Sequence, residues 1–140
     1  MYLSGYLKKN QHEYYQRLSA VRMDGDWEGW INFFLDGVAT AAADAERAVV
    51  ALASLVAADR RRLLAAPRVG AAVLRLFELL PLMPRFTIDQ VRKKLATTFP
   101  TATVAVKLLE ELGIVVELTG QKKNRCFSYA SYVALLTSST

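Results

Sequence analysis

The sequence contains one cysteine and one histidine among its 140 residues. A single cysteine excludes an internal disulfide and every zinc motif built on cysteine pairs, and Cys126 lies in a strand-like run where we expect a small core residue. His12 lies beside Glu13 in a polar helical stretch. We expect it to be solvated, because a catalytic or metal-binding histidine needs partners. No metal or cofactor is therefore predicted.

Long hydrophobic runs are also lacking. The most apolar stretch, residues 48–58, has about half the length needed to cross a bilayer. The N-terminus lacks the basic, apolar and small-residue pattern of a signal peptide. Glycine-rich phosphate loops of the Walker and Rossmann types are absent as well. We therefore expect a cytoplasmic protein with no membrane partner.

Hydrophobic residues make up 53% of the chain and charged residues 22%, enough for a folded core in one domain or two small ones. The net charge of +5 is unevenly distributed. Residues 84–140 contain eight cations and four anions, so most of the positive excess lies there. This asymmetry is compatible with a nucleic-acid partner, and a solvated basic face is the alternative.

Residues 86–129 have the order of a winged helix-turn-helix: two helices, then two strands joined by a basic turn. Thr87 and Gln90 have capping-box spacing, which predicts a helix that begins at Thr87. Pro100 suits the first turn of the second helix, and Gly113 suits the left-handed residue that ends it. The predicted buried stripes of these helices contain Ile88, Val91, Leu95, Ala105, Leu108, Leu109 and Leu112.

Residues 114–118 and 126–129 are the predicted strands of a hairpin, and the turn between them carries three cations. Residues 69–80 predict the first helix of this domain, and residues 131–136 predict a short closing helix. The expected core face of the first helix contains Val73, Leu76, Phe77 and Leu80.

The N-terminal half is expected to be helical. One helix is predicted over residues 2–23 and ends at Gly25, after which Asp26 caps a second helix that extends toward Ala66. We expect a bend or break in the second helix, because unbroken it would be about 60 Å long. The arginine run near its end, residues 60–62, is expected to be solvated.

The predicted fold class is therefore mainly α with a small β-hairpin. It combines a helical segment, residues 1–66, with a winged helix-turn-helix domain, residues 67–140. Four aromatic residues of the second helix offer more apolar surface than two helices readily cover. We expect them to pack against the first helix and a second copy of the chain, which makes a homodimer a candidate assembly. These aromatic residues are Trp27, Trp30, Phe33 and Phe34.

Residues 2–38 resemble the segment that follows the catalytic motif in Fic-family (Fic/DOC) proteins. The similarity rests on the opening Tyr2-Leu3-Ser4, on Glu13-Tyr14-Tyr15, and on the turn Gly25-Asp26-Trp27-Glu28 leading to Trp30, Phe33-Phe34-Leu35 and Gly37-Val38. Residues 68–133 are similar to the winged helix often joined to that core. Here the similarity includes Thr101-Ala102, residues 109–114 and the basic wing with Gly120.

Fic enzymes transfer AMP from ATP to a protein hydroxyl, using a His-Pro-Phe motif followed by a Gly-Asn-Gly-Arg loop. In this chain His12 is followed by Glu13, and no such loop occurs. The resemblance therefore implies the non-catalytic C-terminal part of a Fic-family AMP-transferase, without enzyme activity of its own. It also implies that the missing Fic catalytic domain is a partner that covers the aromatic helices.

Two functions are open. In the first, the segment is a regulatory or targeting module whose winged helix binds double-stranded DNA. Its second helix has one cation and no Arg, Asn or Gln, which moves the expected contact surface toward the wing. The alternative is a protein-protein interaction or dimerisation module without nucleic-acid binding. The candidate DNA contacts are Thr101, Thr103 and Lys107 on the helix, Lys122, Lys123 and Arg125 on the wing, and Arg92, Lys93 and Lys94 at the flank.

Overall fold

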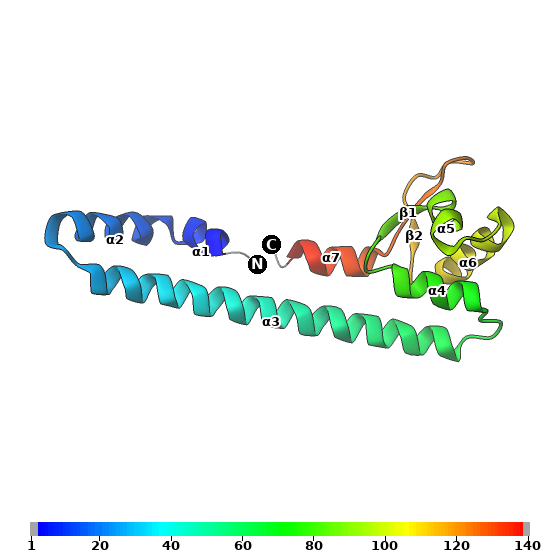
Figure 1. Cartoon of the computed structure of the whole chain (residues 1–140), viewed down its shortest axis with the longest axis horizontal. Coiled ribbons are helices and arrows are strands. Elements are labelled where there is room, and N and C mark those ends of the chain that lie inside the picture. The colour runs from blue at the N-terminus through cyan, green and yellow to red at the C-terminus, as the bar shows by residue number, and fades with distance from the viewer. Residues whose placement is uncertain (1–2, 139–140) are drawn as a thin grey trace. The chain divides into compact units, whose positions relative to one another are not determined.

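The computed structural model describes residues 3–138, which form seven helices and three short strands (Figure 1). The predicted class, mainly α with a small β-hairpin, is confirmed, and the hairpin belongs to a three-stranded antiparallel sheet. The chain divides into an N-terminal unit, up to Ala51, and a C-terminal unit, Leu52–Leu136. Within residues 3–138, no helix has both the length and the apolar character needed to cross a bilayer.

The N-terminal unit begins with α1 (Leu3–Lys9) and α2 (Gln11–Asp24). The prediction of one helix over residues 2–23 is wrong, because the helix is interrupted at Asn10; residue 2 lies outside the described residues. Both the backbone N and the side-chain Nδ2 of Asn10 donate to the carbonyl of Tyr6, at 3.0 and 2.9 Å. The asparagine amide thus competes with the helical ladder. Gly25 ends α2 in the left-handed region (φ 67°), as predicted.

Helix α3 (Trp27–Ala65) is continuous, so the expected break is absent. Asp26 caps its start as predicted, since Oδ1 accepts from the backbone N of Gly29 at 3.0 Å. Gly37 serves packing instead of a break: a Cβ at this position would lie 2.7 Å from the ring of Tyr6. The glycine lets α1 approach α3 closely, and α1 and α2 lie beside the first part of α3 (Figure 1).

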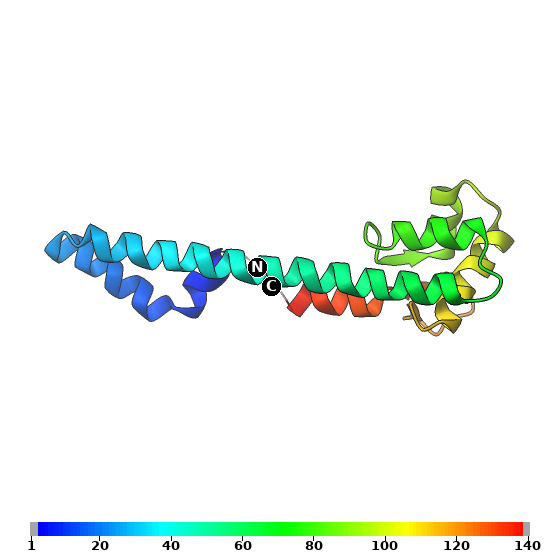
Figure 2. The same cartoon turned by 90° about the horizontal axis from the view of Figure 1, so that it is seen from below.

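The C-terminal unit begins with the last part of α3. Helix α4 runs beside this part in the opposite direction (Figures 1 and 2). The remaining elements follow in the order helix, strand, helix, helix, strand, strand, helix. Their bounds are α4 (Ala71–Leu79), β1 (Arg85–Thr87), α5 (Ile88–Leu95), α6 (Phe99–Glu111), β2 (Val116–Glu117), β3 (Cys126–Ser128) and α7 (Ala130–Ser138).

Local capping chemistry positions α5 and α6. The predicted capping box is confirmed: Thr87 Oγ1 accepts from the backbone N of Gln90 at 3.3 Å, and Gln90 Oε1 accepts from the backbone N of Thr87 at 2.9 Å. Pro100 lies in the first turn of α6, as predicted. Gly113 has φ 74° after α6, and Ile114 is buried behind it.

The sheet has the strand order β1-β3-β2. Strand β1 was not predicted, because it has only three residues and follows two prolines. Strands β2 and β3 are shorter than the predicted 114–118 and 126–129. For β2 the reason lies at the end of α6, where the backbone N atoms of Ile114 and Val115 both donate to the carbonyl of Leu109, at 3.0 and 3.3 Å, and so are not available for strand pairing.

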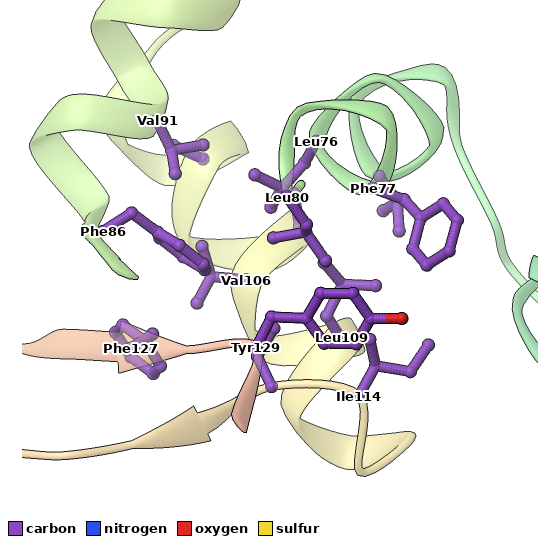
Figure 3. Close-up of a cluster of buried hydrophobic side chains, with 14 of the residues drawn as sticks. Leu76, Phe77, Leu80, Phe86, Val91, Val106, Leu109, Ile114, Phe127 and Tyr129 are labelled. Carbon is purple, nitrogen blue, oxygen red and sulfur yellow. The ribbon is translucent and has the colours of Figure 1, made fainter. Parts of the chain in front are cut away.

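The core of the C-terminal unit lies between its helices and one face of the sheet (Figure 3). The predicted core faces of α4, α5 and α6 are confirmed. On α5 and α6 the predicted residues Ile88, Leu108 and Leu112 are only partly buried, at the edge of the core. Phe86 of β1 stacks on Phe127 of β3, with ring centroids 6.0 Å apart. Leu63 of α3 is fully buried in the same core. Cys126, predicted as a core residue, is only half-buried.

The arginines near the end of α3 are all exposed, as expected for a solvated run, and two of them also form hydrogen bonds. Arg60 donates to both carboxylate oxygens of Glu78 on α4, at 2.9 and 3.0 Å. Arg62 donates to Asp59 at 2.9 Å and to the carbonyl of Leu112 after α6. These contacts join the end of α3 to α4 and to the end of α6.

Candidate nucleic-acid interface

The turn between β2 and β3, which we call the wing (residues 118–125), carries two fully available cations. Lys122 and Lys123 are exposed, and neither has an ion-pair partner among the described residues. A hydrogen bond closes the base of the turn: the backbone N of Leu118 donates to the carbonyl of Cys126 at 2.8 Å. The residues between them extend from the sheet and carry the two lysines. The wing therefore presents two unneutralised positive charges to solvent.

Arg125, the third predicted wing contact, is engaged within the hairpin. Its Nε donates to Glu117 Oε1 at 2.9 Å, and its guanidinium lies 5.4 Å from the centroid of the Phe127 ring. The hydrogen bond with Glu117 raises the pKa of Arg125, and the same bond lowers the pKa of Glu117. Arg125 thus stiffens the base of the wing with a neutralised charge.

Helix α6 offers few polar groups for reading bases. Thr101 is exposed, but its hydroxyl lies 2.9 Å from that of Thr98, which caps the helix. The Thr103 hydroxyl donates to the carbonyl of Phe99 at 2.8 Å. Lys107 is exposed and has no ion-pair partner in the described part of the chain. Of the three predicted contacts on α6, only Lys107 presents a group that is not already hydrogen-bonded locally.

The exposed surface of α6 also includes large apolar side chains. Val104 is 65% exposed and Phe99 is 54% exposed. A groove of about 400 Å³ runs between this face and the start of α4, with Arg68 at its edge. Its α6 wall consists of Pro100, Thr101, Val104, Ala105 and Leu108. Sequence reasoning placed DNA-reading side chains on this face and missed its exposed apolar character.

The flanking cations of α5 are unequal. Arg92 and Lys93 both pair with Asp89, at 2.8 and 3.0 Å, and these bonds lower the pKa of Asp89. Lys94 is exposed and has no ion-pair partner within residues 3–138. Arg85 of β1 joins Lys93 and Lys94 around a hollow of about 480 Å³. Sequence reasoning did not single out Arg85, because its place in the site depends on the unpredicted strand β1.

Other chemistry is sparse. His12 is exposed, as predicted, and its Nε2 lies 3.0 Å from Gln16 Nε2. Among the described residues, no group of three or more His, Cys, Asp or Glu side chains is arranged to hold a metal ion.

No protein-family model matches the chain, and a search of curated proteins gives no significant match. The resemblance to the Fic family therefore depends on the sequence features quoted above.

Proposed function

We propose that the C-terminal unit is a winged helix-turn-helix that binds duplex DNA through its phosphate backbone, as a regulatory or targeting module of a Fic-family AMP-transferase. The element order α4-β1-α5-α6-β2-β3 and the sheet order β1-β3-β2 support the winged-helix assignment. The observation that carries DNA binding is the pair of exposed, unpaired lysines on the wing, Lys122 and Lys123. Lys107 and Lys94 add positive charge on α6 and α5.

Backbone contact is favoured over base reading. Thr101 and Thr103 have hydrogen-bonded hydroxyls, and α6 has no Arg, Asn or Gln to make paired contacts with base edges. Phosphate contacts position a protein on DNA without selecting a sequence. We therefore expect similar affinity for duplexes of different sequence.

The test is the salt dependence of binding to mixed-sequence duplex DNA. Each phosphate contact contributes about 0.9 to the slope of log affinity against log salt concentration. Changing both Lys122→Ala and Lys123→Ala should therefore reduce the slope by about 2. The matched control is Lys8→Ala with Lys9→Ala, which removes the same charge from exposed positions of α1 and should leave the slope nearly unchanged. Absence of binding by the unmodified chain even at low salt would contradict the proposal.

A second candidate function, docking of a protein, is favoured by the apolar face of α6. Exposed Val104 and Phe99 suit a protein partner better than a phosphate backbone. Val104→Glu shows whether α6 lies against DNA or is left free for a protein partner. If α6 lies against DNA, the added negative charge of Val104→Glu should weaken DNA binding, as the substitutions of Lys122 and Lys123 do. If the wing alone contacts DNA, Val104→Glu should leave DNA affinity unchanged.

The Fic part of the proposal has its own test. In the parent gene, coding sequence upstream of Met1 should contain His-Pro-Phe followed by Gly-Asn-Gly-Arg. A genomic sequence without this motif would remove the transferase from the proposal and leave the DNA-binding winged helix untouched.

A further inference from the structure

The first part of α3 has an apolar face that α1 and α2 do not cover. Helical spacing places its members along one side of the helix, and Ile31 and Leu35 are 50% and 56% exposed. The other side of α3 faces α1 and α2: Phe33 lies 5.7 Å from Tyr6, and Trp30 lies 5.6 Å from Tyr14, between ring centroids. We call the uncovered face the outer stripe. It consists of Trp27, Ile31, Leu35, Val38 and Val49.

The N-terminal unit lacks a core of its own. Among its described residues, Phe33 is the only hydrophobic side chain in the buried class. Units this small usually need cross-links, metals or oligomerisation, because contacts between a few short helices bury little apolar area. Neither a disulfide nor a metal cluster is found among the described residues. A partner that covers the outer stripe would supply the missing core.

We propose that the outer stripe of α3 binds the outer stripe of a second copy of this chain, with the two helices antiparallel and Val38 at the two-fold axis. Two helical hairpins then form a four-helix bundle. The stripes of two copies amount to on the order of 1,000 Å² of buried surface, the lower limit for a specific interface.

The distribution of side-chain size specifies the antiparallel direction. The bulky members, Trp27, Ile31 and Leu35, lie in the first part of the stripe, and small residues, Ala42 and Ala45, follow in its second part. With Val38 at the axis, Ile31 faces Ala45 of the partner. Leu35 faces the region of Ala42, Trp27 faces Val49, and large side chains thus meet smaller ones on both sides of the axis, which fills the space evenly. A parallel pair would place Trp27 on Trp27 and leave a gap at Ala45.

Charge is compatible with this arrangement. Asp36 and Arg47 lie on the side of α3 away from the outer stripe by helical spacing, so both remain in water. Glu28 borders the stripe and, in the antiparallel pair, lies near the exposed Glu46 of the partner copy at the edge of the interface, where water screens the repulsion between the two carboxylates. The proposal depends on the N-terminal unit alone and is independent of DNA binding by the wing.

The first experiment measures the mass of the full chain in solution by light scattering at tens of micromolar. We expect twice the mass of one chain. Ile31→Glu with Leu35→Glu should give the mass of one chain. The matched control is Asn32→Glu with Thr40→Glu, which changes exposed positions of the same helix outside the outer stripe and should remain dimeric. A monomeric unmodified chain would overturn the proposal and favour a different protein, such as a catalytic domain, as the occupant.

The second experiment does not require a folded monomer. In a Cys126→Ser background, Val38→Cys should cross-link to itself on mild oxidation. The double variant Ile31→Cys with Ala45→Cys should also form intermolecular disulfides, whereas Ile31→Cys alone should not. Self-cross-linking of Ile31→Cys would indicate a parallel pair, and a dimer without any of these cross-links would place the interface elsewhere. Either result overturns the proposed antiparallel contact.

Discussion

At the residue scale, the C-terminal unit is organised around a buried hydrogen bond. The Tyr129 hydroxyl donates to Asp59 Oδ2 at 2.6 Å, and Arg62 donates to Asp59 Oδ1 at 2.9 Å. Tyr129 is fully buried and Asp59 is 5% exposed. Because Asp59 belongs to α3 and Tyr129 follows β3, the bond fixes the end of the long helix to the sheet. A buried carboxylate with two charge-assisted partners is well satisfied.

Tyr129→Phe should lower the free energy of unfolding of the C-terminal unit by about 1 to 3 kcal/mol. The substitution keeps the ring and removes the hydroxyl, so Asp59 is left buried with one partner fewer. Urea titration followed by circular dichroism measures the change. Tyr132→Phe is the matched control: its ring stacks on that of Tyr129 with centroids 5.4 Å apart, but it is only half-buried. We expect a change within about 0.5 kcal/mol there.

The same tyrosine predicts a pH dependence. Burial, followed by the bond to Asp59, raises the pKa of Tyr129 above its usual value near 10. The folded state therefore favours the neutral phenol, and this contribution is fully present below about pH 10 and is lost as pH rises further. The stability difference between the unmodified chain and Tyr129→Phe should become smaller above about pH 10. A difference that stays constant to pH 11 would contradict the assigned hydrogen bond.

At the element scale, the connection from α5 to α6 depends on an unusual residue. Ala96 ends α5 in the left-handed region, with φ 50° and ψ 48°. The backbone N of Thr97 donates to the carbonyl of Arg92 at 3.1 Å, which closes the helix end. This geometry ordinarily belongs to glycine, because a Cβ costs about 1 to 2 kcal/mol there. The tight turn that sets α6 against α5 therefore contains local strain.

Ala96→Gly should raise the free energy of unfolding by about 0.5 to 1 kcal/mol. The gain is the relieved left-handed strain, less the extra backbone entropy of glycine in the unfolded chain. Ala96 is exposed, so no core contact is lost. The matched control is Ala53→Gly, an exposed position inside α3, where we expect a loss of about 1 kcal/mol. Equal losses at both positions, measured by urea titration, would show that the turn is not strained.

Elements defined by neighbouring residues were predictable from the sequence. The capping box of Thr87 and Gln90 and the helix end at Gly113 depend on chemistry within a few positions. Strand β1 and the Asp59 to Tyr129 bond join residues far apart in the chain, and no local pattern reports them. The same limit applies to the site. Lys122 and Lys123 are exposed as a polar turn predicts, whereas the pairing of Arg125 with Glu117 depends on the register of the hairpin.

At the scale of the whole molecule, the two units differ in how they are stabilised. The C-terminal unit has a contiguous core that contains Tyr129, Phe77 and Leu63. In the described part of the N-terminal unit, Phe33 is the only hydrophobic side chain in the buried class, and on our proposal the unit needs a second copy to complete its core. Independent units with unequal cores unfold in separate steps. The chain offers a direct way to distinguish them, because its two tryptophans, Trp27 and Trp30, both lie in the N-terminal unit.

Tryptophan fluorescence should therefore report unfolding of the N-terminal unit at a lower urea concentration. Circular dichroism should show a second step, at a higher urea concentration, when the C-terminal unit unfolds. If a second copy completes the N-terminal core, the fluorescence midpoint should rise with protein concentration, since association stabilises only the associated form. The later step belongs to the C-terminal unit and should not depend on concentration. Tyr129→Phe provides the control, because it should shift the later step and leave the fluorescence transition in place. Coincident transitions by both probes, shifted together by Tyr129→Phe, would show instead that α3 couples the units into one cooperative fold.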